Sequence, residues 1–144
     1  MTTFVETFLT LCTIDGTPTA DLSDLVLGGN VSLNIDRAIP LTCEVTVRNP
    51  SVVRPYLDYL MPSIRYIYDD GRAQVSSPLG IYAVRVPPSI VFGREATGQV
   101  QGEDLTAILA ASASTTATTT PSGTNVTTEL EAIISGAGIT RYHI

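Results

Sequence analysis

Residues 31–48 contain two short segments in which apolar and polar side chains alternate strictly. The apolar positions are Val31, Leu33 and Ile35 in the first segment and Leu41, Cys43, Val45 and Val47 in the second. A period of two places each apolar set on one face of a β-strand. The sequence DRAIP joins the two segments, which read as a strand pair. We expect Leu33, Ile35, Cys43 and Val45 to hold the core, beneath a polar outer face.

The remaining pattern extends this pair into a larger sheet. The chain has 144 residues, which fits one domain or little more. Turn signals separate six or seven short strands, without the alternation of strands and helices that a parallel sheet requires. The predicted fold class is therefore mainly β with α (α+β). It comprises an antiparallel β-barrel or sandwich followed by two short helices.

Several elements of this sheet can be placed from local signals. Residues 8–14 alternate and precede the turn sequence DGTP. Tyr56, Leu57, Leu60 and Met61 have helical spacing after Pro55, which predicts a short helix there. Residues 64–68 alternate into DDG, a hairpin signal. Residues 79–86 predict the next strand, and residues 89–104 predict one more, bent at Gly93 or Gly98.

The character of the chain changes near residue 103. Asp104 can cap a short helix over LTAILAAS. Residues 112–124 form a Ser/Thr-rich loop, and a second helix follows. Its apolar stripe is Val126, Leu130, Ile133, Ile134 and Ala137, with Asn125 or Thr124 as the cap and Gly136 or Gly138 at its end. We therefore divide the chain into a β-barrel domain (1–102) and a helical segment (103–144) that starts a second domain.

The inventory of catalytic groups is small. His143 is the single histidine and stands one residue from the end, a poor place to position a base. Asp15, Asp21 and Asp24 lack the spacing of a calcium loop and read as turn formers. Glu103 and Asp104 are adjacent, so in a strand they would point to opposite faces. We expect no catalytic set, no metal site and no cofactor, and hence no enzyme.

Charge, hydropathy and cysteine content limit the possible binding partners and the state of the thiols. The formal net charge is −6, and the basic residues are scattered arginines, so we expect no specific nucleic-acid binding. No apolar run is long enough for a membrane span, and the N-terminus lacks the pattern of a signal peptide. Cys12 and Cys43 could form one bridge. Because both lie in strand patterns, buried free thiols are the favoured state.

The order of these segments resembles a known protein family. The segments are LGGNVSLNIDRAIPLTCEVTVRNP, LMPSIRYIYDDG, PLGIYAVRVPPSI, VQGEDLTAIL and a helix ending in IISGAGI. Together they are similar to the N-terminal part of the baseplate hub or tail-tip proteins of tailed bacteriophages, often called minor tail proteins. PLG before a strand and GED before a helix are the most telling pieces. The absence of lysine fits phages of GC-rich hosts.

The resemblance implies a structural role. Hub proteins form trimers in which two related barrels per subunit present a pseudo-sixfold ring to the tail tube, although this chain holds a single barrel. The implied partners are tail-tube, distal-tail, tape-measure and tip proteins, and the implied location is the virion tail tip. Neighbouring subunits would then contact the polar outer face. The candidate interface residues are Asn34, Asp36, Arg37, Glu44 and Arg48.

An alternative is a stand-alone β-sandwich module that recognises a glycan or protein of the host surface. Sugar sites favour exposed aromatic rings for stacking. The chain has no Trp, and most tyrosines lie in strand or helix patterns, so this alternative ranks below the hub.

Overall fold

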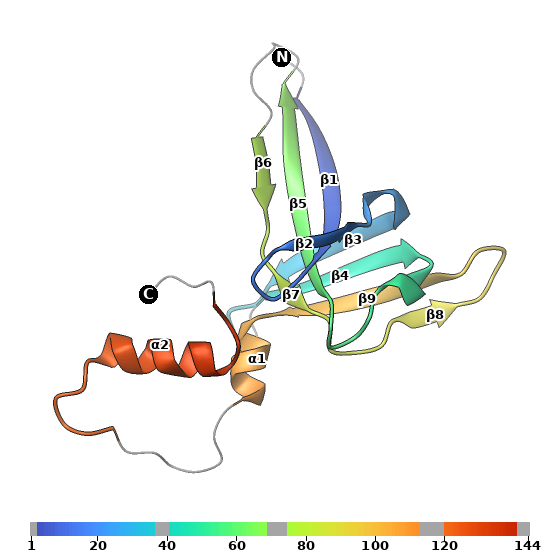
Figure 1. Cartoon of the computed structure of the whole chain (residues 1–144). Coiled ribbons are helices and arrows are strands. Elements are labelled where there is room, and N and C mark those ends of the chain that lie inside the picture. The colour runs from blue at the N-terminus through green and yellow to red at the C-terminus, as the bar shows by residue number, and fades with distance from the viewer. Residues whose placement is uncertain (1–2, 37–40, 69–74, 113–119, 141–144) are drawn as a thin grey trace.

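The fold is an antiparallel sheet with two α-helices at one end (Figure 1). The computed structural model describes residues 3–36, 41–68, 75–112 and 120–140. The strands are β1 (Thr3–Cys12), β2 (Pro18–Asp21), β3 (Val26–Leu33), β4 (Leu41–Arg48), β5 (Tyr59–Tyr68), β6 (Val75–Pro78), β7 (Tyr82–Ala83), β8 (Ser89–Val91) and β9 (Thr97–Asp104). The helices are α1 (Thr106–Ala111) and α2 (Val126–Gly136), with short 3-10 turns η1 (Ser23–Leu25) and η2 (Pro50–Val52).

The nine strands of the described residues belong to one sheet. Its main path runs β2-β1-β5-β7-β9-β4-β3, with β6 beside β5 and β8 beside β9. Every strand pairing is antiparallel. The predicted α+β class with an antiparallel sheet is confirmed. The sheet is not closed as a barrel, because its path begins at β2 and ends at β3.

The predicted strand pair around DRAIP is β3 and β4, and its pairing is confirmed. Val31 lies opposite Cys43 and Leu33 lies opposite Leu41. Cys43 and Val45 are buried, because β4 is flanked by both β3 and β9. The expected core role of Leu33 and Ile35 is wrong: their exposed fractions are 65% and 83%. They lie at the end of β3 and beyond it, where the sheet terminates and none of the described residues covers their apolar face.

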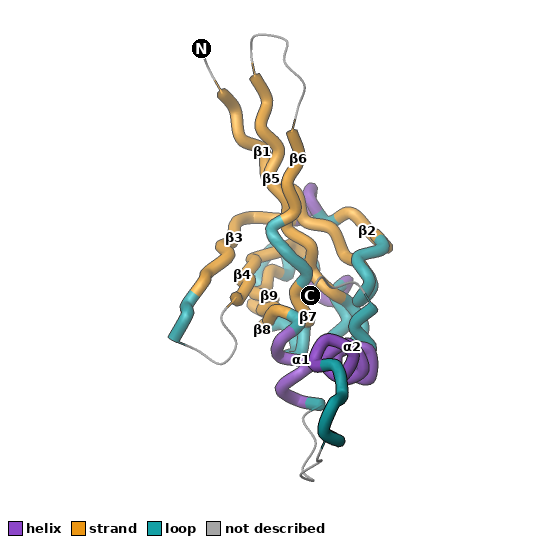
Figure 2. Tube along the Cα trace, turned by 90° about the vertical axis from the view of Figure 1, so that its left-hand side faces the viewer, coloured by secondary structure: helices purple, strands orange, loops and turns teal. Residues whose placement is uncertain are grey.

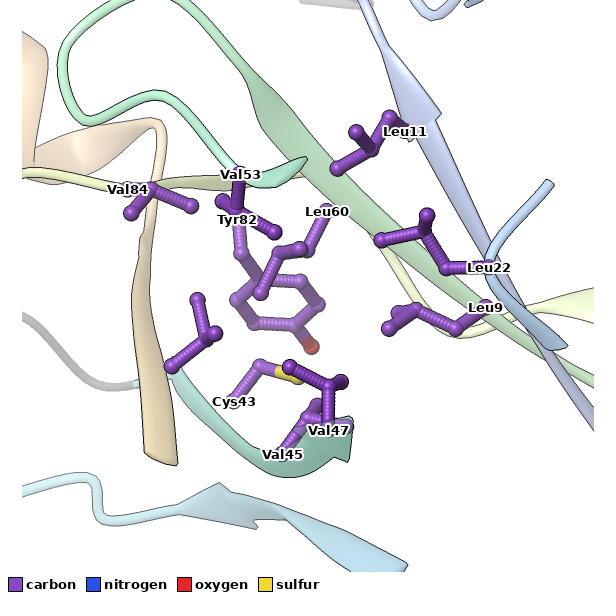
Figure 3. Close-up of a cluster of buried hydrophobic side chains, with 11 residues drawn as sticks. Leu9, Leu11, Leu22, Cys43, Val45, Val47, Val53, Leu60, Tyr82 and Val84 are labelled. Carbon is purple, nitrogen blue, oxygen red and sulfur yellow. The ribbon is translucent and has the colours of Figure 1, made fainter. Parts of the chain in front are cut away.

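The core is centred on β7, a strand of two residues (Figure 3). Tyr82 is 1% exposed and packs among Leu60, Val47 and Val100, which are fully buried. Its hydroxyl donates a hydrogen bond to the carbonyl of Leu79 at 2.9 Å. β7 pairs with β5 on one side and with β9 on the other, so it joins the two halves of the sheet.

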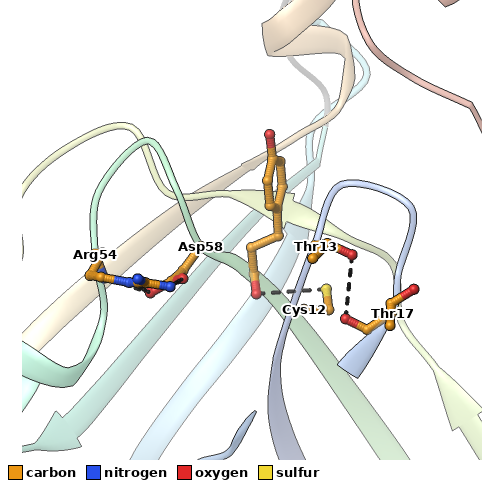
Figure 4. Close-up of polar contacts among 6 residues, drawn as sticks. Cys12, Thr13, Thr17, Arg54 and Asp58 are labelled. Atoms are coloured by element: carbon orange, nitrogen blue, oxygen red, sulfur yellow. Dashed lines mark hydrogen bonds and ion pairs between the residues drawn. The ribbon is translucent and has the colours of Figure 1, made fainter. Parts of the chain in front are cut away.

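The predicted helix after Pro55 is wrong, because this segment is a turn followed by β5. Tyr56 has a φ of 65°, which a right-handed helix does not allow. The carboxylate of Asp58 holds the turn: it accepts hydrogen bonds from the backbone N–H of Arg54 at 2.8 Å and from Arg54 Nη2 at 2.7 Å (Figure 4). Leu60 then points into the core as part of a strand.

Two further sequence assignments are corrected. The predicted single strand over residues 89–104 is the hairpin β8–β9, in which Ile90 lies opposite Gly98. Of the predicted strand over residues 79–86, only Tyr82 and Ala83 form a strand. Alternation predicts a longer strand with one buried face, whereas the consecutive residues 82–84 are all buried. The predicted hairpin turn at residues 69–71 lies outside the described residues, and the antiparallel pair β5–β6 flanks it.

Strands β1, β5 and β6 extend beyond the rest of the sheet as a ribbon, which is clear in both views (Figures 1 and 2). The face of this ribbon that continues the core carries Val5 opposite Tyr66, which are 57% and 38% exposed. On the other face Arg65 stacks over the ring of Phe8 at 4.3 Å. The ribbon therefore leaves apolar groups uncovered outside the body.

The helices follow the predicted caps in part. Asp104 accepts hydrogen bonds from the N–H of Thr106 at 2.9 Å and from the N–H of Leu41 at 3.1 Å, so it ties α1 to β4. Asn125 caps α2 by accepting the N–H of Thr127 at 2.9 Å. Gly138, with a φ of 83°, follows the end of this helix. The division at residues 102 and 103 stays a prediction.

Gly102 tests the packing around β7. A Cβ at this position would lie 2.7 Å from the Cβ of Tyr82 and 3.4 Å from Leu60 Cδ1. We expect Gly102→Ala to lower the free energy of unfolding by about 1–3 kcal/mol, because the core has no room for a methyl group. Urea denaturation measures this change. Gly28→Ala is the control, since a Cβ there meets nothing within 4 Å; equal losses in both variants would contradict the packing argument.

Asp58 gives the fold a pH-dependent contribution. Burial would raise the pKa of this carboxyl group, but the hydrogen bonds and charge of Arg54 outweigh burial and lower the pKa below 3.8. A lowered folded-state pKa stabilises the fold above the unfolded value, and the contribution is lost as the pH falls through the folded value.

We expect Asp58→Asn to lose roughly 1.5–3 kcal/mol at pH 7, the usual contribution of hydrogen bonds to a charged group. The difference from the wild type should shrink below about pH 4. Denaturation curves between pH 2 and pH 7 measure both effects. A difference that stays constant over this range would show that the charge of Asp58 is not its source.

Candidate protein-interaction surface

The outer face of β3, β4 and β9 is polar and centres on Glu44. Register places Glu44 opposite Asn30 on β3 and opposite Gln101 on β9. Its Oε1 accepts hydrogen bonds from Gln99 Nε2 and, at 3.3 Å, from Gln101 Nε2. Gln99 and Gln101 lie two residues apart on the same face of β9, and both side-chain amides therefore bind the carboxylate of Glu44. This cluster presents both donors and acceptors outward.

Two ion pairs flank the cluster. Arg48 Nε lies 3.6 Å from Glu95 Oε2, and Arg85 Nη1 lies 3.9 Å from Glu103 Oε2. The side chains are between 37% and 69% exposed. Exposed pairs of this kind contribute about 0–1 kcal/mol each, so their members can exchange partners at little cost. The face therefore offers charges of both signs to another protein.

A hollow of about 280 Å³ lies over this face. Its lining includes Asn30, Glu44, Arg85 and Gln101. Amide, carboxylate and guanidinium groups line it together, so it can receive a polar side chain through hydrogen bonds of either direction.

The five predicted interface residues do not form one cluster. Glu44 and Arg48 share the polar face, but four strand positions separate them by about 13 Å. Asn34 and Asp36 are exposed past the end of β3, where Asn34 Oδ1 accepts the N–H of Asp36 at 3.1 Å. Arg37 lies outside the described residues. We did not predict Gln99 and Gln101 as members of this face, although Thr97, Gln99, Gln101 and Glu103 alternate with Gly98, Val100 and Gly102.

A second hollow, of about 340 Å³, is apolar. It lies between β3 and the strands β1 and β5, and its lining includes Phe8, Leu9, Val31, Cys43 and Ile64. None of its lining residues is charged. Burial, with a smaller effect of Glu44, raises the pKa of the Cys43 thiol to about 12, so this group stays protonated at neutral pH. The hollow suits an apolar side chain rather than bond-making chemistry.

The acidic turns have local structural roles. Hydrogen bonds from Thr13 and Thr17 lower the pKa of Asp15, and hydrogen bonds from Ser23 lower the pKa of Asp21. Both carboxylates therefore act as turn acceptors, as predicted from their sequence positions. Within the described ranges, no group of three or more His, Cys, Asp or Glu side chains is arranged to hold a metal ion. Those ranges also contain no helix with the length and apolarity of a membrane span.

Cys12 and Cys43 are free and buried, which confirms the favoured state. The Cys12 thiol donates to the carbonyl of Tyr59 at 3.7 Å (Figure 4), and burial, with a smaller effect of Asp15, raises its pKa to about 11. Because both thiols are protonated and inaccessible, we expect neither to react with Ellman's reagent at pH 8 in the native protein. Both should react in urea. Rapid reaction of the native protein would contradict this expectation.

Comparisons with known protein families, with curated proteins and with solved structures find no match to this chain.

Proposed function

We propose that this chain is a structural component of a bacteriophage tail tip, a baseplate hub or minor tail protein. It would join the tail tube to the tip through protein–protein contacts and form part of the DNA conduit. Its partners would be tail-tube, distal-tail, tape-measure and tip proteins, together with further copies of itself, as a trimer by family analogy. The segment order described above is similar to that family and supports this assignment.

One structural observation carries the proposal furthest. Large apolar side chains are exposed on elements that extend from the body: Val5 on the ribbon, Phe92 beyond β8 and Ile133 on α2. Exposed apolar groups gathered on projecting elements are typical of surfaces that another protein covers. A component of a larger assembly explains several such surfaces on one small chain.

The charge of the chain is compatible with a conduit. A net charge of −6 repels phosphate groups, so DNA passing an acidic wall would not be retained. The polar face around Glu44 and Arg48 would then serve neighbouring subunits through mixed charges and hydrogen bonds.

Charge reversal at Arg48 tests the polar face as an interface. We expect Arg48→Glu to fold normally, because Arg48 is exposed, and to reduce phage titre at least tenfold by impairing tail assembly. Asp24→Arg is the control: it reverses an exposed charge on η1, away from this face. Plaque counts and electron microscopy of tails measure the effect. Normal tails with Arg48→Glu would count against this face.

Virion content tests the function itself. Mass spectrometry of washed virions should find the chain in a fixed ratio to the tail-tube protein. Its absence from washed virions would overturn the proposal.

The alternative is a module that binds a host-surface glycan. Tyr56 is 70% exposed, which would allow one ring to stack on a sugar. Among the described residues, the other exposed rings are Tyr66 on the ribbon and Phe92 beyond β8, so these three rings do not form one platform. Glycan-array binding that Tyr56→Ala abolishes would favour this alternative.

A further inference from the structure

Two exposed apolar surfaces lie at opposite ends of the molecule. The first is the hairpin tip, residues 90–94, between β8 and β9. The second is the helix stripe, formed by Val126, Leu130 and Ile133 on α2. Figure 1 shows β8 and α2 at opposite ends of the sheet. The tip of a chain therefore cannot reach the stripe of the same chain.

The hairpin tip combines apolar groups with an arginine. Ile90, Val91 and Phe92 are 42%, 66% and 85% exposed. The pairing of Val91 with Thr97 fixes the base of the tip on β9. Arg94 is exposed and has no hydrogen bond or ion pair to any residue of the described ranges. The tip thus presents an apolar wedge beside an unpaired positive charge.

The helix stripe combines apolar groups with a carboxylate. Val126, Leu130 and Ile133 are 72%, 42% and 57% exposed. Glu129 precedes Leu130 and lies one turn before Ile133, so it borders the stripe on the helix surface. Within the described part of the chain, no ion pair involves Glu129. The stripe thus presents an apolar row beside a negative charge.

α2 lies largely on the surface of the described part of the chain. No residue of the helix is buried, and it is held near its C-terminal end, where Ile139 is 4% exposed. The helix has 11 residues, and helices shorter than about 12–15 residues are marginal in water without tertiary packing. A contact along the stripe would supply the missing packing.

We propose that the hairpin tip of one copy packs on the helix stripe of a second copy. Phe92 would cover Leu130 and Ile133, and Arg94 would pair with Glu129. The partner is a second copy because the complementary surfaces both belong to this chain. A tip-to-tip contact would place two Arg94 side chains together, and a helix-to-helix contact would place two Glu129 side chains together. Like charges disfavour both of these symmetric contacts.

A contact between two different surfaces repeats from copy to copy, and it closes into a ring when the rotation permits. The patches are small, so a single contact is weak and ring closure strengthens it. This inference rests on the proposed function, because such a contact would act within a ring of subunits at the tail tip. The contact itself can be measured on the purified chain, independently of virion content.

Two single variants and their mixture test the contact. Phe92→Ser removes the largest apolar side chain of the tip and leaves the stripe unchanged. Ile133→Ser removes an apolar side chain of the stripe and leaves the tip unchanged. Sedimentation velocity should show concentration-dependent oligomers for the wild type and at least a tenfold weaker association for each variant alone. An equimolar mixture retains one intact tip and one intact stripe, so it should form heterodimers that do not grow further. Circular dichroism checks that both variants are folded.

A charge exchange tests the pairing of Arg94 with Glu129. Arg94→Glu alone and Glu129→Arg alone should each weaken association, because each places like charges at the contact. In a mixture of the two variants, each contact between unlike copies has opposite charges, so the mixture should associate more strongly than either variant alone. Asp24→Arg, on η1 and outside both contact surfaces, is the matched control for Glu129→Arg and should leave association unchanged.

Three outcomes would overturn the proposal. The first is a wild-type chain that stays monomeric at millimolar concentration. The second is a pair of serine variants that associate as the wild type does. The third is a mixture of serine variants that forms no heterodimer although each variant is folded. Any of these would leave the virion test of the proposed function unaffected.

Discussion

The packing of Tyr82 in the two-residue strand β7 is the constraint on which the rest of the sheet depends. β7 is the connection between β5 and β9, and therefore between the half-sheet that holds β1 and the half-sheet that holds β4. Two residues supply few backbone hydrogen bonds, so burial of the Tyr82 side chain has to hold the connection. The absence of a side chain at Gly102 lets β9 approach this ring. The hydroxyl remains satisfied by the carbonyl of Leu79, so burial leaves no unpaired polar group.

A sheet that is held at its centre, and is not closed as a barrel, leaves its outer strands partly uncovered. The ribbon of β1, β5 and β6 extends past the core, β3 ends the sheet, and the β8–β9 hairpin carries Phe92 away from it. These exposed regions follow from the same arrangement. The β3 edge also borders the apolar hollow, so the surface nearest the core is open to a neighbour. The open form of the sheet therefore also determines which surfaces are exposed to a neighbouring protein.

Sequence patterns identify elements whose burial follows from local order. Alternation predicts both the strand β4 and its buried residues correctly, because β4 has a neighbouring strand on each side and one covered face. β3 reads correctly as a strand, but the exposure of Leu33 and Ile35 depends on what lies opposite them in space, which periodicity does not contain. The turn before β5 depends on a carboxylate contact from Asp58 and a positive φ at Tyr56. By contrast, the period-two pattern of residues 97–103 was available in the sequence, so Gln99 and Gln101 could have been assigned to the polar face.

The C-terminal helix differs from the sheet, because its local signals are correct but none of its residues is buried. Asn125 caps α2 and its stripe has helical spacing, yet the stripe faces solvent. Capping contributes about 1 kcal/mol and does not replace packing of an amphipathic face. The sequence thus specifies a helix whose apolar stripe has no covering partner among the described residues. If assembly supplies this partner, ordering of the helix and association of subunits are one coupled step, and the affinity of the contact includes the cost of forming the helix.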